Sequence, residues 1–361
     1  MTIFDLVESK AIAMYWQEQE SNRIPFLGEA LFPARKKVGL DLSWLKGSND
    51  LPVALMPSAF DAKPTLRDRI GVQRLETELP FFREAMRIGE KDRQKILQFL
   101  NNVNSQYLTD AIQKIYDDAS KLIAGARVQP ERMRMSLLVD GKISIEAPND
   151  KGVLVKYNYD YDPEGTWRAA NTQTLAGEEM WSAAATSNPI QDILNVKRTM
   201  RVKYGVEITR AICTTKTWAY LMTNQAIKND MNVLQGSRII LTDGMLQTYL
   251  LQKTGVNFVI YDKMYKNEAG VAKQYYPDNY VTFLPDYSLG STYFATTPEE
   301  ADLMSGALTD ASVSIVDTGV AVLTKKESLP VNVITSVSEI VLPSFERMDD
   351  VYVIHVSNVG E

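Results

Sequence analysis

The sequence contains a single cysteine and a single histidine among its 361 residues, and this shortage excludes several kinds of site. Cys213 has no second cysteine to pair with, so no disulfide can form within the chain and a reducing compartment suits its folding. A zinc site needs more histidine and cysteine ligands than His355 and Cys213 can supply. We expect Cys213 to be a small buried residue and His355 to have a structural role within a strand.

Motifs of nucleotide-binding and hydrolytic enzymes are also missing. The sequence has no P-loop, no G-x-G-x-x-G and no G-x-S-x-G. No apolar stretch approaches the roughly 18 residues of a membrane span. Residues 1–8 lack the basic and apolar regions of a secretory signal. We therefore expect a soluble protein without membrane contact and with no catalytic, cofactor-binding or metal-binding residues.

Positive charge is in short supply, since the formal net charge is −6. A dedicated nucleic-acid binder usually has a basic excess, so we expect only weak, non-specific contact with DNA. Arg35, Lys36 and Lys37 form a local basic group that could touch phosphate, but three residues favour a surface or interface role.

Two acidic segments could suggest a metal site. Asp160 and Asp162 stand at alternate positions, as at the start of a calcium loop, but Pro163 interrupts the pattern and the other ligands are missing. Exposed acidic turns are the simpler interpretation of this segment and of Asp349-Asp350. A metal-dependent enzyme remains the weakest alternative.

The most prominent pattern that is present predicts a long helix over residues 84–124. Apolar residues recur there every three or four positions, and the opposite face is charged. Such a helix would be on the order of 60 Å long, which favours a strut in an architectural protein. We expect it to end near Gly125 and to be followed by a hairpin over 135–145, with Asp140-Gly141 as the turn, and by a strand over 153–161.

The remaining segments predict an α+β protein. Before the long helix we expect a helix over residues 3–20, an irregular arm that lies over another surface, and a projecting β-hairpin over 50–79. After it, helices and strands alternate from Asn188, which predicts a compact α/β lobe. Two final strands, over 331–342 and 351–356, are expected to return together to the β region beside the long helix.

This order of elements resembles the major capsid proteins of tailed bacteriophages, and more narrowly their lambda-type, or E-type, family. The segment from Val53 to Pro57 leading into Asp61–Pro64 resembles the entry to the extended loop of that family. Residues Tyr276–Phe283 resemble a strand late in its axial lobe. The ending from Val333 to Val356 resembles its closing strands.

The resemblance implies an icosahedral phage head that encloses double-stranded DNA, with the protein located in the virion after assembly in the host cytoplasm. The partners it implies are other copies in pentamers and hexamers, and scaffolding, decoration and portal proteins. Some relatives form covalent crosslinks; Lys63 lies near the expected loop tip, but we assign no crosslink without a partner motif. An encapsulin-like compartment shell shares the expected fold and stays the main alternative.

The same resemblance implies a division of the chain into five parts. They are an N-terminal arm (1–49), an extended hairpin loop (50–82), a peripheral lobe with the long helix and strands (83–187), an axial α/β lobe (188–325), and C-terminal strands that return to the peripheral lobe (326–361).

Overall fold

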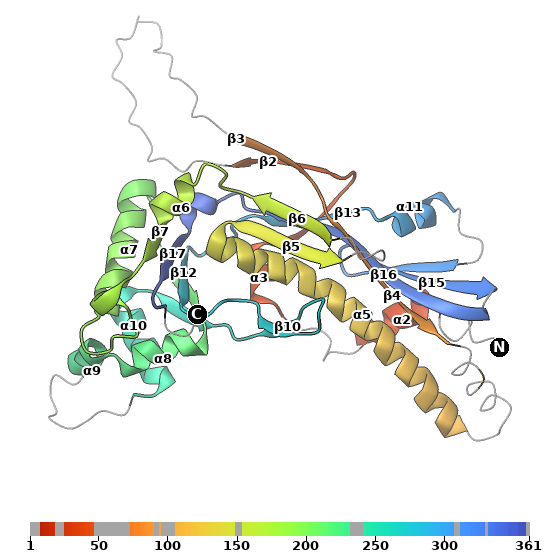
Figure 1. The fold of residues 1–361 in the computed structure, drawn as a ribbon, viewed down its shortest axis with the longest axis horizontal. Coiled ribbons are helices and arrows are strands. Elements are labelled where there is room, and N and C mark those ends of the chain that lie inside the picture. The colour runs from red at the N-terminus through yellow and green to blue at the C-terminus, as the bar shows by residue number, and fades with distance from the viewer. Residues whose placement is uncertain are drawn as a thin grey trace, which may run out of the picture. The chain divides into compact units, whose positions relative to one another are not determined.

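The computed structural model describes residues 8–18, 25–46, 73–89, 94, 105–148, 154–231, 241–306, 311–328 and 331–358. They form two compact units (Figure 1). Unit 1 draws on the described parts of residues 1–43, 76–133 and 291–344, and unit 2 on those of 44–75, 134–290 and 345–361. Both units combine helices with strands, as the prediction of an α+β protein requires.

Unit 1 is built around one large sheet. Its elements are α2 (Ser9–Glu18), α3 (Leu27–Leu31), β1 (Ala34–Lys37), β4 (Phe81–Ile88), α5 (Ser105–Asp140) through Met133, β13 (Ser291–Ala295), α11 (Pro298–Ser305), β14 (Ala311–Val316), β15 (Val320–Ser328) and β16 (Val331–Ser344). The strand order is β1-β13-β16-β15-β14, and β4 also pairs with β16. The 14-residue strand β16 therefore organises the sheet.

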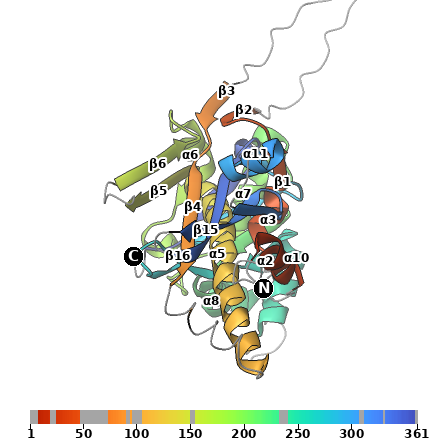
Figure 2. The same ribbon diagram turned by 90° about the vertical axis from the view of Figure 1, so that its right-hand side faces the viewer.

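The N-terminal helix is part of the core of unit 1. Ile12 and Trp16 of α2 are buried in one apolar cluster with Leu122 and Ile123 of α5 and with Val322 of β15. Figure 2 shows α2 beside α5. The helix expected over residues 3–20 is therefore present as α2, from Ser9 to Glu18, and it lies over a surface of its own chain. The apolar face of α2 supplies the area for packing within its own chain.

The long helix exists, but its limits differ from those predicted. Residues 84–88 belong to β4, whose pairing with β16 extends from Phe81 to Ile88 and overrides the helical pattern. The described helix α5 then spans 36 residues, from Ser105 to Asp140. At 1.5 Å per residue its length is about 54 Å. The helix passes through both Gly125 and Pro130, because packing of its neighbouring residues outweighs the local cost of these two.

The end of α5 replaces the predicted first strand of a hairpin. Met135, Leu137 and Leu138 are buried helical residues, and a short apolar run of this kind does not distinguish a helix from a strand. Gly141 has φ +65° and donates its backbone N–H to the carbonyl of Leu137 at 3.0 Å. It therefore ends the helix as a left-handed cap and does not form a hairpin turn.

Unit 2 contains the remaining part of α5 and most of the smaller elements. They are β5 (Lys142–Pro148), β6 (Leu154–Asp160), α6 (Thr166–Asn171), β7 (Thr172–Thr174), η2 (Gly177–Glu179), α7 (Pro189–Tyr204), β8 (Arg210–Cys213), α8 (Thr215–Thr223), α9 (Gln225–Met231), α10 (Asp243–Thr254), β9 (Asn257–Ile260), β10 (Met264–Lys266), β11 (Ala272–Gln274), β12 (Tyr280–Leu284), η3 (Met348–Asp350) and β17 (Tyr352–His355). The alternation predicted from Asn188 onward is present, and the Asn188 side chain caps the start of α7.

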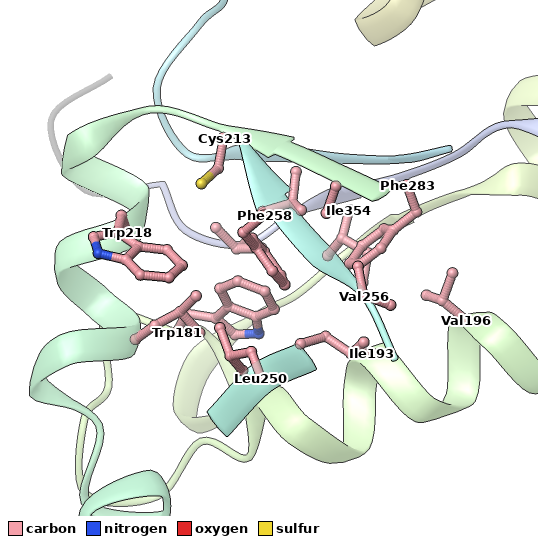
Figure 3. Close-up of a cluster of buried hydrophobic side chains, with 14 of the residues drawn as sticks. Trp181, Ile193, Val196, Cys213, Trp218, Leu250, Val256, Phe258, Phe283 and Ile354 are labelled. Carbon is pink, nitrogen blue, oxygen red and sulfur yellow. The ribbon is translucent and has the colours of Figure 1, made fainter. Parts of the chain in front are cut away.

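A five-stranded sheet in the order β7-β17-β12-β8-β9 forms the centre of unit 2. One of its faces packs against helices α7 to α10 through a large apolar core. In Figure 3, Trp181, Trp218 and Phe258 point toward one another above Ile193 of α7. On the opposite face, the Thr282 hydroxyl donates to the Leu138 carbonyl at the end of α5. The end of α5 therefore contacts the face of the sheet opposite helices α7 to α10.

The two C-terminal strands do not return to one place. β16 pairs with β4, β13 and β15 in unit 1, whereas β17 lies between β7 and β12 in unit 2. The expectation that residues 326–361 return together is therefore wrong. Ile354 and Val356 are fully buried in the unit 2 core, so apolar packing determines the position of the final strand.

The predicted projecting hairpin can be followed only at its base. β2 (Asp41–Lys46) pairs with β3 (Gln73–Glu78) in a two-stranded sheet. Residues 47–72, which include Lys63, Arg67 and Arg69, lie outside the described residues. Another two-stranded sheet, of β5 and β6, contains the predicted strand over 153–161 as β6.

Candidate functional site

The sequence segment Tyr276–Phe283 contains a turn that connects three parts of unit 2. The side chain of Asp278 accepts a 2.7 Å hydrogen bond from the Thr214 hydroxyl, just before α8. The next backbone N–H, that of Asn279, donates to the Thr217 hydroxyl at 3.0 Å. The Tyr220 hydroxyl donates to the Asn279 side-chain oxygen at 3.1 Å. The turn therefore fixes the first part of α8 against the start of β12.

The backbone of Asn279 also holds the end of the described chain. Its carbonyl accepts the Val356 N–H at 2.8 Å. Asn279 has φ +66° and is fully buried. Asparagine tolerates this left-handed conformation better than most residues do. The motif that carried the family resemblance thus has a structural role, which is to join α8, β12 and the segment after β17.

The acidic pair Asp160 and Asp162 anchors a helix. Asp162 is buried and its carboxylate accepts the backbone N–H groups of Trp167 and Arg168 and the Thr166 hydroxyl. Asp160 forms an ion pair with Arg168 at 2.5 Å. The expectation of an exposed turn is wrong for Asp162, because N–H donors at the start of α6 attract its carboxylate into the interior.

Asp349-Asp350 is likewise more than a solvated turn. Asp350 is buried and accepts the Tyr287 hydroxyl at 2.7 Å. The carbonyl of Asp349 accepts the buried Asn171 side-chain amide at 2.8 Å. These contacts hold η3 against neighbouring segments of unit 2 and do not leave a pair of free carboxylates.

His355 and Cys213 occupy positions within the five-stranded sheet. The His355 ring stacks on Tyr280, its cross-strand neighbour, with ring centroids 4.5 Å apart. Cys213 is fully buried, and burial raises the pKa of its thiol, which makes the reactive thiolate scarce at neutral pH. The predictions of a buried cysteine and of a histidine within a strand are confirmed.

The basic group Arg35-Lys36-Lys37 forms most of β1, at one edge of the unit 1 sheet. The Lys36 ammonium donates to a carboxylate oxygen of Glu300 and to the Ala295 carbonyl. Arg35 is exposed and Lys37 is partly exposed. Lys36 is therefore committed to an internal ion pair, and only its two neighbours are available to a partner.

Sequence reasoning missed the polar contacts that hold α3 to α5 within unit 1. Buried Glu131 of α5 accepts the Gly28 N–H at 3.1 Å, near the start of α3. Arg127, one turn earlier on α5, donates to Glu29 at 3.0 Å. The four-residue spacing of Arg127 and Glu131 was a detectable signal of a shared helix face, but their targets are about 100 positions away.

A second missed group lies at the start of α11. Glu299 is buried and accepts hydrogen bonds from Arg83 of β4 and, at 2.8 Å, from Ser338 of β16. The sequence Thr297-Pro298-Glu299-Glu300 contains a helix-start signal, since Thr297 caps the Glu300 N–H and proline takes the first position. That signal could have located α11, but not the partners of Glu299.

These arrangements stabilise strands and helix ends and bring no nucleophile and base together. Within the described ranges, no group of three His, Cys, Asp or Glu side chains could hold a metal ion. Among the described helices, none is long and apolar enough to cross a membrane. The expectation of no catalytic, cofactor-binding or metal-binding residue stays a prediction.

Comparisons with known proteins connect this architecture to phage capsids. The structure is similar to that of a putative capsid protein of an Escherichia coli prophage, with a TM-score of 0.57, 13% identity and coverage of 97% of this chain and 99% of the other. It is also similar to a phage-related protein from Bordetella bronchiseptica, with a TM-score of 0.55, 13% identity and coverage of 98% of both chains. A comparison with curated protein sequences gave no match. At such low identity these similarities show the fold, which spans both units.

A sequence comparison extends this finding from fold to family. The sequence model described as phage major capsid protein E matches residues 8–348, which includes most of both units. Its members are structural proteins of the phage head, so the function of this chain is that of a coat subunit of the virion and not that of an enzyme. The chain belongs to the phage major capsid protein E family.

Proposed function

We propose that copies of this chain assemble as pentamers and hexamers into an icosahedral shell that encloses double-stranded DNA. The family match over residues 8–348 is the observation that supports this proposal. In this proposal the unit 2 sheet with helices α7 to α10 is the axial lobe, and the unit 1 sheet with the unit 1 part of α5 is the peripheral lobe. The axial lobe was expected over residues 188–325, but β13, α11, β14 and β15 belong to unit 1 and so pass to the peripheral lobe. Residues 1–49 and 50–82 keep their roles as an arm and an extended loop, with the described part of the arm packed on unit 1 of its own chain.

The interior surface of such a shell faces packaged DNA. With a net charge of −6, a subunit cannot neutralise many phosphates, and walls of like charge let the DNA slide during filling. We therefore assign only non-specific contact with DNA. Scaffolding, decoration and portal proteins are further partners in this proposal, and host cytoplasm is the place of assembly.

Electron microscopy of the purified and concentrated full chain is the direct test. Closed particles of uniform diameter with five-fold and six-fold clusters of subunits are expected. A protein that stays monomeric under all assembly conditions, with intact helices and strands by circular dichroism, would contradict the proposal. Recovery of a specific protein cargo inside the particles would instead favour a compartment shell.

A further inference from the structure

Helix α11 has two exposed apolar residues, Leu303 and Met304, near its C-terminal end. Of its eight residues, Pro298 to Ser305, Glu299 is the one that is buried. Leu303 and Met304 are exposed, and the Met304 side chain keeps 78% of its surface accessible. A surface helix in a folded domain usually turns its apolar side chains toward the core. The exposed side of α11 therefore has the character of a surface that a partner covers.

Polar contacts are what fix α11 in place. Thr297 caps its first turn, Glu299 accepts hydrogen bonds from Arg83 and Ser338, and Glu300 pairs with Lys36. These contacts lie at the N-terminal end of the helix. They hold the C-terminal end, with Asp302, Leu303 and Met304, in a defined position before any partner arrives.

A second surface of unit 1 has the complementary character. β1 and the turn after it present Arg35, Lys37, Val38 and Leu40, and Val38 keeps 88% of its surface accessible. Protection of the sheet edge explains the basic residues of this surface but not the apolar ones. Basic side chains on an edge strand do prevent pairing with other strands. Two exposed apolar residues directly after the strand do not serve that purpose.

Within one copy, Arg35 and Lys37 do not face the exposed end of α11. Side chains alternate between the two faces of a strand, and Lys36 points to Glu300 of α11. Arg35 and Lys37 therefore project from the other face of β1. Asp302 is exposed and forms no ion pair with another described residue, so its carboxylate can face a second molecule.

We propose that the outer end of α11 in one copy docks against β1 and the following turn of a second copy. Leu303 and Met304 then contact Val38 and Leu40, while Asp302 faces Arg35 and Lys37. This inference rests on the proposed self-assembly and names one of its contacts. Because two different surfaces meet, the contact is heterologous and joins more than two copies.

Engineered cysteines test the geometry of this contact. The chain has one cysteine, Cys213, which is buried, so an introduced pair reports without interference. Mild oxidation of assembled V38C/M304C is expected to give a ladder of disulfide-linked chains beyond the dimer, reversed by reduction. Each single variant should stay unlinked, and so should V202C/M304C, which uses another exposed residue, on α7. Particles of V38C/M304C without a ladder would overturn the inference.

Exchanging the charges on the two surfaces tests whether they stabilise the proposed contact. Asp302→Lys, or Arg35→Glu with Lys37→Glu, is expected to lower the yield of particles at least about fivefold, the equivalent of about 1 kcal/mol. Combining Asp302→Lys with Arg35→Glu and Lys37→Glu should restore much of the yield. Arg198→Glu, at an exposed position of unit 2, should leave the yield unchanged. Equal yields from all variants, with circular dichroism unchanged, would contradict the contact. Absence of particles from the unaltered protein would instead contradict the proposed function.

Discussion

The backbone carbonyl of Asn279 accepts the backbone N–H of Val356 at 2.8 Å, and Asn279 makes this contact in a left-handed conformation with φ +66°. The bond fastens the segment after β17 to the turn before β12. Trp181 strengthens the same junction, because its backbone N–H donates to the Val356 carbonyl at 2.9 Å. Unit 2 thus depends on a residue that combines an unusual backbone angle with a polar side chain.

Substitutions of Asn279 should separate the contribution of its left-handed backbone conformation from that of its polar side chain. Asn279→Ala is expected to lower the free energy of unfolding by about 2–3 kcal/mol, since it adds left-handed strain to the loss of a buried hydrogen bond. Asn279→Gly avoids the strain, and Tyr220→Phe removes only the hydroxyl donor. Asn279→Gly and Tyr220→Phe should each lower the free energy of unfolding by less than Asn279→Ala does. Tryptophan fluorescence during denaturant unfolding measures the order, and equal stability of the alanine and glycine variants would argue against strain.

Gly141 is expected to be sensitive to substitution for two reasons. Its φ is +65°, and an added Cβ would lie 3.1 Å from the rigid Trp167 ring and would displace the end of the flexible Met348 side chain. Gly141→Ala should therefore destabilise the protein by about 2 kcal/mol or more. Gly165 is the matched control, because it has φ +69° but open space around it. Gly165→Ala should cost only about 1 kcal/mol. Equal shifts in the midpoint of thermal unfolding would show that crowding against Trp167 and Met348 is unimportant.

The role of Asp162 as a helix anchor predicts insensitivity to calcium. Its carboxylate already accepts three hydrogen bonds from residues at the start of α6. Asp162→Ala should lower the free energy of unfolding by about 1–2 kcal/mol. Addition of calcium or magnesium should leave the unfolding temperature of the unaltered protein unchanged. A rise in that temperature that Asp162→Ala abolishes would show that a metal ion binds there.

Glu207 should make stability depend on acidity. Hydrogen bonds from Arg201 and Lys197 lower the pKa of its carboxyl group below the ordinary value of 4.5. Because this pKa is lower in the folded state than in the unfolded state, ionised Glu207 stabilises the protein at pH values above its unfolded-state pKa. The stabilisation is lost as the pH falls through the folded-state pKa. The side chain is 48% exposed, so solvent screening limits the effect to about 0.5 kcal/mol.

Denaturant midpoints of the Glu207→Gln variant provide the measurement. The variant should be slightly less stable than the unaltered protein at pH 7 and equally stable well below pH 4.5, the ordinary value for this carboxyl. Glu164→Gln is a suitable control, since Glu164 is exposed on the loop before α6. A constant difference between the Glu207→Gln variant and the unaltered protein at all pH values would contradict a titrating contact.

The extended loop should contribute to assembly through its charges. Arg67→Glu with Arg69→Glu is expected to weaken assembly and to leave the fold of the subunit intact. Each charge contributes about 1 kcal/mol or less, but a closed shell repeats the contact many times. Unchanged yield and salt resistance of the particles would contradict this role.

DNA binding should be weak, independent of sequence and sensitive to salt. Titration of soluble subunits with duplexes of different sequence, near physiological salt, measures it. Specific complexes typically bind about 10³–10⁷ times more tightly than non-specific ones. A nanomolar isotherm that depends on sequence would be incompatible with a passive shell wall.

The sequence by itself determined much of the local structure. Helical periodicity predicted α2, the alternation from Asn188 predicted the helices and strands of the α/β lobe, and apolar runs predicted β16 and β17, because side-chain spacing reflects which face of an element meets a core. The order of these segments also indicated the family, since it reflects nearly the whole chain. The chain's lack of cysteine and histidine likewise limited what chemistry it could support.

Only the tertiary structure decided where these segments go. The register between β4 and β16 converts residues 84–88 from predicted helix to strand, and core packing extends α5 through Pro130. Burial of Ile354 places β17 in the unit 2 sheet, although β16, its neighbour in sequence, belongs to the unit 1 sheet. Partners such as Asn279 and Val356 are separated by long stretches of chain. Their pairing depends on many packing contacts between residues far apart in the sequence, and a local sequence pattern does not predict such contacts.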